Sequence, residues 1–155
     1  MNGSAKGVVA PSSNPDEMLI GRITEHEGIK KFAYTDILGY ITVGVGRCLD
    51  AKVGKGLSID EIFYLLRNDI KEFRNQLGQF EWFVMQDEVR RGVLVELAFN
   101  MGIPHLLQFK KMIGALTIKN YPLACKELMD SIWATQVGKS RSDDICYRLK
   151  NGRYK

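Results

Sequence analysis

Residues 26–47, HEGIKKFAYTDILGYITVGVGR, combine acidic side chains, a threonine and several glycines with residues that normally pack in a core. Glu27 stands directly before a glycine, Asp36 follows nine residues later, and Thr42 follows six residues after Asp36. A buried strand does not need the acids, and a solvated loop does not need the neighbouring aromatic and branched residues. The stretch therefore indicates a polar site built on a rigid scaffold.

The sequence before this stretch predicts a helix that ends at Glu27. Residues 14–17 have the pattern of a helix start, in which Asn14 is the cap, a proline takes the first helical position and two acids follow. Leucine and isoleucine side chains then form an apolar face, and Gly28 is placed to end the helix. Glu27 is thus expected in the last helical turn.

Short strands are predicted on both sides of Asp36. Residues 32–34 favour a strand, and residues 35–39 place an aspartate and a glycine where turns need them. Residues 40–45 alternate, with Thr42 on the face opposite to the apolar side chains. The glycines near this second face leave it open to a ligand or to another backbone.

The remainder of the chain predicts helices. Ser58 and Glu61 form a capping box, and apolar residues continue at helical spacing for about five turns, which gives a helix long enough to join two lobes. Further helices are predicted at residues 86–101, 106–118, 121–134 (with Asn120 as cap) and 142–150. Aromatic residues expected in the core are Phe80, Trp82, Phe83, Phe99, Phe109 and Trp133.

These elements predict an α+β fold in a single domain at residues 16–155. Its small β-hairpin lobe is expected at about residues 28–57. Its larger helical lobe is expected at about residues 78–155, together with the first helix at residues 16–27. Residues 1–15 are rich in Gly, Ser, Ala and Pro and are expected to form a flexible arm.

The composition is that of an ordinary globular protein with a basic balance. Of 155 residues, 45% are hydrophobic and 26% are charged, so a packed core is expected and global disorder is not. The net charge of +4 favours an anionic partner, such as nucleic acid, an acidic membrane face or a cell-wall polymer. Simple solubility explains the same charge equally well.

The cysteines and histidines form no recognisable ligand pattern. Cys48, Cys125 and Cys146 are odd in number, far apart and without a CxxC spacing. Neither a disulfide framework nor a zinc site is therefore expected, and a reducing site of synthesis is favoured. His26 and His105 are lone residues in separate segments, so no metal and no other cofactor is expected.

Glu27, Asp36 and Thr42 together have the chemistry that glycosidic cleavage requires. Two carboxylates in unlike surroundings can differ in pKa, so that one remains a proton donor while the other remains ionised. A threonine hydroxyl can hold a water molecule against a carboxylate. Taken singly, an acid at a helix end, an aspartate in a turn and a threonine in a strand are usually structural.

The stretch at residues 26–47 resembles the signature of the phage-type lysozymes, glycoside hydrolase family 24. In that signature, Glu-Gly is followed by Asp after eight residues and by Thr after five more, within a Gly-Tyr-x-Thr-x-Gly-x-Gly strand. Every member of the signature is present: Glu27, Gly28, Asp36, Gly39, Tyr40, Thr42, Gly44 and Gly46. The likeness to the T-even members continues through residues 89–102, Phe109 and Ser140-Arg141, and covers about residues 17–154.

The resemblance implies a two-lobed, lysozyme-like fold and a muramidase that cleaves the β-1,4 bond between N-acetylmuramic acid and N-acetylglucosamine. Glu27 would be the general acid, Asp36 the carboxylate across the cleft, and Thr42 its partner in positioning water. Arg141 matches a basic position near the first helix once one residue is inserted after Trp133. The residues that match positions lining or supporting the sugar cleft are Phe99, Asn100 and Phe109.

Several positions depart from the family pattern. Arg47 stands where many members carry a histidine, and only fifteen residues separate Thr42 from Ser58, which predicts a trimmed sheet. Glu127 and Met112 replace shorter polar residues of the family. These departures concern the width of the cleft and its contacts with substrate.

Three alternatives remain open from the residues. The resemblance favours an inverting route, with Asp36 and Thr42 holding the attacking water, but a direct nucleophilic role for Asp36 stays open. A lytic transglycosylase would need the acid but has little use for Asp36 and Thr42. A non-catalytic wall-binding or virion module would need none of the three.

The partner expected is peptidoglycan, with no nucleic acid and no stable membrane insertion, for a monomeric enzyme. No apolar run approaches the roughly 18 residues that span a bilayer, and the first residues lack the apolar region of a signal peptide. An endolysin is therefore expected, made in the host cytoplasm and acting on the wall in the periplasm through a separate holin-like pore. A virion-associated location is the alternative.

Overall fold

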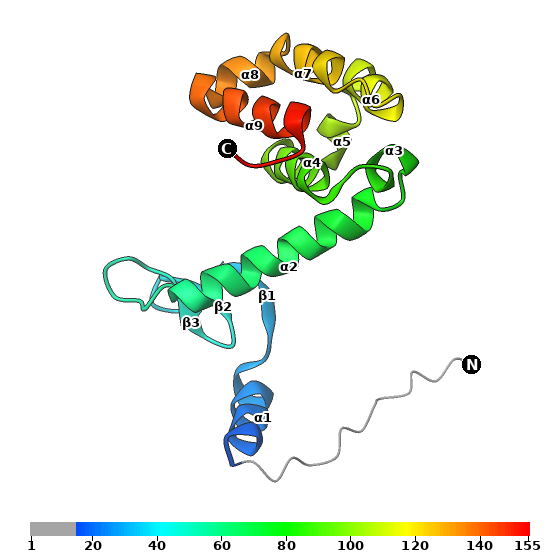
Figure 1. Cartoon of the computed structure of the whole chain (residues 1–155). Helices are drawn as coiled ribbons and strands as arrows, with labels where there is room; N and C mark the ends of the chain where they lie inside the picture. Colours follow the sequence, from blue (N-terminus) through cyan, green and yellow to red (C-terminus); the bar gives the residue numbers. More distant parts are fainter. Residues whose placement is uncertain (1–14) are drawn as a thin grey trace, which may run out of the picture. The chain divides into compact units, whose positions relative to one another are not determined.

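The computed structural model describes residues 15–155. All of the predicted arm except its last residue, and the predicted cap Asn14, lie outside these described residues. The chain runs through one helix, a small sheet and then a series of helices (Figure 1). It divides into two compact units, of which the first ends at Glu61 and the second is Ile62–Lys155.

Helix α1 (Pro15–Glu27) ends where the sequence predicts. Gly28 has a φ of 72°, which favours glycine, and its N–H donates to the carbonyl of Thr24 at 2.9 Å. Glu27 is therefore the last residue of the helix. Its apolar residues are largely exposed, with Leu19 57% and Ile23 45% accessible.

The sheet is antiparallel, with strand order β1-β2-β3, and it precedes a helical region, which confirms the predicted α+β class. Its strands are β1 (Lys30–Thr35), β2 (Ile41–Gly44) and β3 (Arg47–Cys48). In the central strand, Thr42 pairs with Tyr34 on one side and with Cys48 on the other. The strands are short, so the sheet is little more than a support for the β1–β2 turn.

The alternation along β2 does not mark its buried side. Thr42 is only 3% exposed, whereas Ile41 is 47% and Val45 is 37% exposed. Thr42 is paired with a residue of the neighbouring strand on each side, Ile41 is the first residue of β2, and Val45 lies beyond its end. The most protected side chain of the strand is therefore a polar one.

Helix α2 (Ile59–Leu77) begins with the predicted capping box. The N–H of Glu61 donates to Oγ of Ser58 at 3.2 Å, and the N–H of Ser58 donates to Oε2 of Glu61 at 2.7 Å. Arg47 also binds the Glu61 carboxylate, at 2.8 Å. The hydrogen bond from the Ser58 backbone, with help from Arg47, holds the pKa of Glu61 below its ordinary value of 4.5.

The second unit is a bundle of short helices around one apolar core. Figure 1 shows α7, α8 and α9 side by side, and contacts also join α4 to α9 and α6 to α7. The helices are α3 (Glu81–Val84), α4 (Glu88–Met101), α5 (Ile103–Leu106), α6 (Lys110–Thr117), α7 (Tyr121–Met129), α8 (Ile132–Val137) and α9 (Lys139–Asn151). Fully buried leucines of four of these helices form the centre of the core: Leu94, Leu97, Leu116, Leu128 and Leu149.

Two segments that the sequence predicts as single helices are each interrupted by a turn in the structure. The segment predicted at residues 106–118 contains the end of α5, a turn, and then α6. The segment predicted at residues 121–134 ends at Met129, and α8 begins after Ser131. The cap of α7 is predicted correctly, because Oδ1 of Asn120 accepts the N–H of Leu123 at 3.1 Å.

The expectation of no disulfide is wrong. Cys125 of α7 and Cys146 of α9 are bonded, with their Cα atoms 5.4 Å apart. The two cysteines are 21 positions apart in the sequence, and this spacing alone does not reveal the pairing. The packing of α7 on α9 brings the two positions together. Cys48 is the free cysteine, and it is partly buried.

Candidate functional site

Asp36 organises the turn between β1 and β2. Its Oδ1 accepts the N–H groups of Leu38 and Tyr40, both at 2.9 Å. Its backbone N–H donates to the carbonyl of Tyr40 at 2.9 Å, and its carbonyl accepts from Gly39 at 3.0 Å. One carboxylate oxygen is thus fixed by the turn, and the other, Oδ2, is left for a further partner.

That partner is Thr42, as the sequence reading requires. The Thr42 Oγ1 lies 3.4 Å from Oδ2 of Asp36 and 3.4 Å from the carbonyl of Tyr40. Both distances are long for a hydroxyl donor, whose usual donor–acceptor distance is about 2.7–2.8 Å. The hydroxyl is therefore loosely held between two acceptors and retains capacity for a water molecule.

Glu27 is not joined to this pair. It is exposed at the end of α1, and among residues 15–155 no hydrogen bond or ion pair connects it to Asp36 or Thr42. The structure thus brings together two of the three predicted catalytic residues. The catalytic roles of all three stay predictions.

Phe99 and Asn100 lie at the end of α4 in the helical unit. Phe99 is 49% exposed, so its assignment to the core is wrong, and its ring packs edge-on against Phe73 with centroids 5.9 Å apart. These two rings border a pocket of about 410 Å³ that also contains Asp69, Glu72 and Gln76. Asn100 points elsewhere, since its Oδ1 accepts the indole N–H of Trp133 at 2.8 Å.

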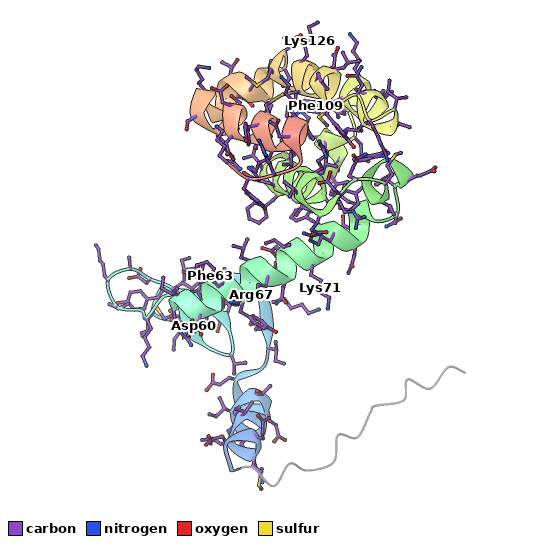
Figure 2. The ribbon with its side chains drawn as sticks, viewed as in Figure 1. Asp60, Phe63, Arg67, Lys71, Phe109 and Lys126 are labelled. Atoms are coloured by element: carbon purple, nitrogen blue, oxygen red, sulfur yellow. A yellow bond between two sulfur atoms is a disulfide. The ribbon has the colours of Figure 1, made fainter. Side chains whose placement is uncertain are left out.

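Phe109, labelled in Figure 2, is half-buried at the start of α6. It lines two pockets of the helical unit, together with Gln108. The first, of about 330 Å³, also holds Lys110, Lys111, Met112 and Glu127. The second, of about 470 Å³, also holds His105, Ser131, Ile132, Trp133 and Gln136. Both pockets therefore combine an aromatic ring with amide or charged side chains.

Arg141 belongs to a charged cluster that the sequence reading missed. Glu96 of α4 accepts Arg148 at 2.8 Å and faces Arg141 at 3.5 Å. Asp144 also binds Arg148, at 2.8 Å. Burial opposes the charge on Arg148, but the two carboxylates outweigh it and raise the pKa of its guanidinium. The helical periodicity of α4 indicates on which face of the helix Glu96 lies. It does not reveal the partners of Glu96, because Arg141 and Arg148 belong to α9.

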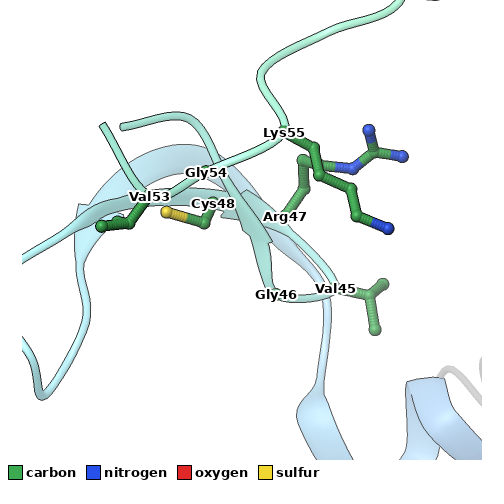
Figure 3. Close-up of a pocket in the computed structure, with 7 residues that line it drawn as sticks. All are labelled: Val45, Gly46, Arg47, Cys48, Val53, Gly54 and Lys55. Atoms are coloured by element: carbon green, nitrogen blue, oxygen red, sulfur yellow. The ribbon is translucent and has the colours of Figure 1, made fainter. Parts of the chain in front are cut away.

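A further pocket lies beside β3 and includes residues 53–55 of the loop that follows it, to which the sequence assigns no function. It has a volume of about 410 Å³ and is lined by Val45, Gly46, Arg47, Cys48, Val53, Gly54 and Lys55. Figure 3 shows the cationic side chains of Arg47 and Lys55 extending from the pocket in the same direction. Arg47 is already bound to Gly56 and Glu61, so it holds the loop against the start of α2.

The described residues contain neither a candidate metal centre nor a candidate membrane-spanning helix. Within the described part of the chain, no group of three His, Cys, Asp or Glu residues could hold a metal ion. None of the helices at residues 15–155 is both long and apolar enough to cross a membrane.

The chain is similar in sequence to a family of phage lysozymes and to two individual proteins. The phage lysozyme family model matches residues 24–150, a segment that includes all the candidate site residues. The chain is 24% identical to "Probable T4-type lysozyme 1" of Dictyostelium discoideum, over 81% of this chain and 89% of that protein. It is 21% identical to the "Pre-baseplate central spike protein Gp5" of Enterobacteria phage T4, over 93% of this chain but only 29% of the spike protein's length.

Proposed function

Because the chain belongs to the phage lysozyme family, a family of glycoside hydrolases, we propose that it is a muramidase that hydrolyses peptidoglycan. The bond cleaved is the β-1,4 linkage between N-acetylmuramic acid and N-acetylglucosamine. The observation that carries this proposal is the pairing of Asp36 with Thr42 in the turn of the family motif, at 3.4 Å.

In the proposed mechanism, Glu27 is the general acid that protonates the glycosidic oxygen. Asp36 is the second carboxylate of the reaction. Its Oδ2 and the hydroxyl of Thr42 hold the water that attacks the sugar, since Oδ1 is occupied by two backbone N–H groups. Direct attack by this water inverts the configuration at the sugar carbon.

The substrate contacts proposed in the helical unit are Phe99, Asn100 and Phe109. Phe99 and Phe109 offer ring surface beside polar side chains, which suits the alternating apolar and hydroxyl faces of a sugar. Asn100 acts indirectly, because its side-chain carbonyl is bound to Trp133. Neither a metal nor another cofactor is part of the mechanism.

The proposed setting is that of an endolysin that degrades the host wall and causes lysis. The monomer is made in the cytoplasm and reaches the periplasm through a separate holin-like pore. The similarity to a phage spike protein supports one other setting, an enzyme carried by the virion. The reaction is the same in both.

Asp36→Asn tests the proposal, because asparagine can keep the turn while removing the charge. We expect clearing of purified murein to slow by at least about a hundredfold. Asp50→Asn is the matched control, since Asp50 holds the N–H groups of Lys52 and Val53 in the same way outside the site. Activity above a tenth of wild type in Asp36→Asn, or an equal loss in the control, would count against the proposal.

A further inference from the structure

The disulfide between Cys125 of α7 and Cys146 of α9 closes a loop that contains the whole of α8. The two cysteines are buried, and their Cα atoms are 5.4 Å apart, a separation that a disulfide spans without movement of the backbone. One covalent bond therefore ties together the two helices that flank α8. The proposed mechanism of cleavage makes no use of this bond.

The closed loop supplies one wall of a pocket of about 470 Å³ that Phe109 also lines. The residues of this wall lie at the start of α8 and within it, and we call them the α8 wall: Ser131, Ile132, Trp133 and Gln136. The opposite side of the pocket lies outside the loop and is formed by His105, Gln108 and Phe109. The shape of the pocket therefore depends on where the loop holds α8.

Helix α8 has few anchors of its own. It contains six residues, and only Trp133 and Ala134 among them are buried. No side chain caps its first turn, and its one hydrogen bond to α4 runs from the indole N–H of Trp133 to Asn100. A helix this short is not stable by itself, so α8 depends on the two helices that flank it.

The bond between the cysteines forms or breaks with the redox state of the surroundings. In thiol–disulfide exchange, the two thiols lose two protons and two electrons as the Sγ–Sγ bond forms, and the disulfide of the oxidant is reduced to two thiols. A reducing cytoplasm favours the dithiol, whereas the periplasm favours the disulfide. The contacts between α7 and α9 keep the two positions together for this exchange.

We propose that the Cys125–Cys146 pair is a redox switch that fixes the α8 wall and strengthens substrate binding once the enzyme has left the reducing compartment. The inference rests on the proposed muramidase function, because it takes the Phe109 pocket as part of the substrate site. Closing a loop of this length disfavours its open forms by a factor on the order of a hundred. Asp36 and Thr42 belong to the other unit, so the switch acts on binding and not on bond cleavage.

The test compares oxidised wild type with wild type reduced by dithiothreitol until two thiols besides Cys48 titrate. On reduction, KM for purified murein should rise by about threefold or more, with kcat nearly unchanged, because fewer molecules hold the pocket in its binding form. The backbone amides of α8 should exchange with deuterium about a hundredfold faster, and faster than those of α4.

Cys146→Ala cannot form the bond, so it should have the KM of reduced wild type with or without dithiothreitol. Cys125→Ala is the second variant if Cys146→Ala folds poorly. Cys48→Ala is the matched control, because Cys48 is the free cysteine and belongs to the other unit, and it should respond to the reductant as wild type does.

Two results would overturn the inference while leaving the muramidase standing. One is a KM that is equal in oxidised and reduced wild type. The other is an α8 that exchanges no faster on reduction, or only together with α4, since the bond would then stabilise the whole unit and not this wall. Failure of both forms to cleave murein would instead refute the proposed function, and the exchange rates would still decide whether the bond fixes α8.

Discussion

Asp36 differs from the other turn aspartate of its unit in what its second carboxylate oxygen faces. Asp50 also caps its own loop, where its side-chain Oδ1 accepts the N–H groups of Lys52 and Val53 and its carbonyl accepts the N–H of Gly54. Asp36 adds the hydroxyl of Thr42 as the neighbour of its Oδ2. Turn geometry explains Oδ1 in both residues, but of the two only Asp36 has its Oδ2 beside a threonine hydroxyl.

Glu27→Gln tests the proposed general acid, because glutamine keeps the shape of the side chain but cannot donate the proton. Cleavage of murein should fall by at least about a hundredfold, the usual scale for general acid catalysis. Glu25→Gln on the same helix is the control and should retain activity, since Glu25 is likewise exposed. Retention of more than a tenth of the rate by Glu27→Gln would remove the acid from the mechanism.

The sequence reveals the pairing of Asp36 with Thr42 because both lie within one hairpin, where spacing along the chain determines spacing in the fold. The same reasoning does not reach Glu27, which belongs to a different element. It also misses the partner of Asn100, because Trp133 is 33 residues away and arrives through packing of the helices.

At the scale of elements, the start of α2 is stabilised by a carboxylate that titrates. The hydrogen bond from the Ser58 N–H is the main reason why the pKa of Glu61 is lower in the folded protein than its ordinary value of 4.5. The ionised Glu61 side chain therefore stabilises the fold at pH values above 4.5, and this stabilisation is lost as the pH falls through the pKa of the folded state. Glu61→Gln should therefore narrow the difference in stability between pH 6 and pH 3. Urea midpoints of wild type and variant at both values check this, and equal pH dependence would contradict it.

The disulfide between α7 and α9 is expected to stabilise the folded protein. Closing a loop of 21 residues restricts the unfolded chain, so reduction should lower the free energy of unfolding by about 3 kcal/mol. Cys146→Ala should unfold at the same denaturant concentration with or without dithiothreitol. Cys48→Ala is the control and should respond to the reductant as wild type does. A wild type insensitive to reductant would show that the bond contributes nothing.

Local signals predict the elements well where they act within a few residues. The capping box at Ser58, the cap at Asn120 and the helix end at Gly28 are all confirmed. The breaks after Leu106 and Met129 are not predicted, because apolar spacing continues through both turns. The disulfide and the burial of Thr42 are missed for a related reason, since both depend on which elements become neighbours.

The net positive charge of the protein is carried by its second, helical unit. Residues 62–155 contain fifteen basic and ten acidic residues, a net charge of +5, whereas residues 1–61 contain seven basic and eight acidic residues, a net charge of −1. Lys110 and Lys111 border one of the Phe109 pockets. An anionic polymer is therefore attracted to the unit that holds the proposed substrate contacts, and the candidate carboxylates lie in the other unit.

The central claim is that this chain hydrolyses the glycan of peptidoglycan, and the masses of the fragments released from purified murein test it most directly. Hydrolysis adds one water across each bond, so new fragments should end in a reducing muramic acid. Fragments that end in an anhydro sugar, one water lighter, would show a lytic transglycosylase. The absence of any fragments from wild type would show a binding module without catalysis, and either result would contradict the account.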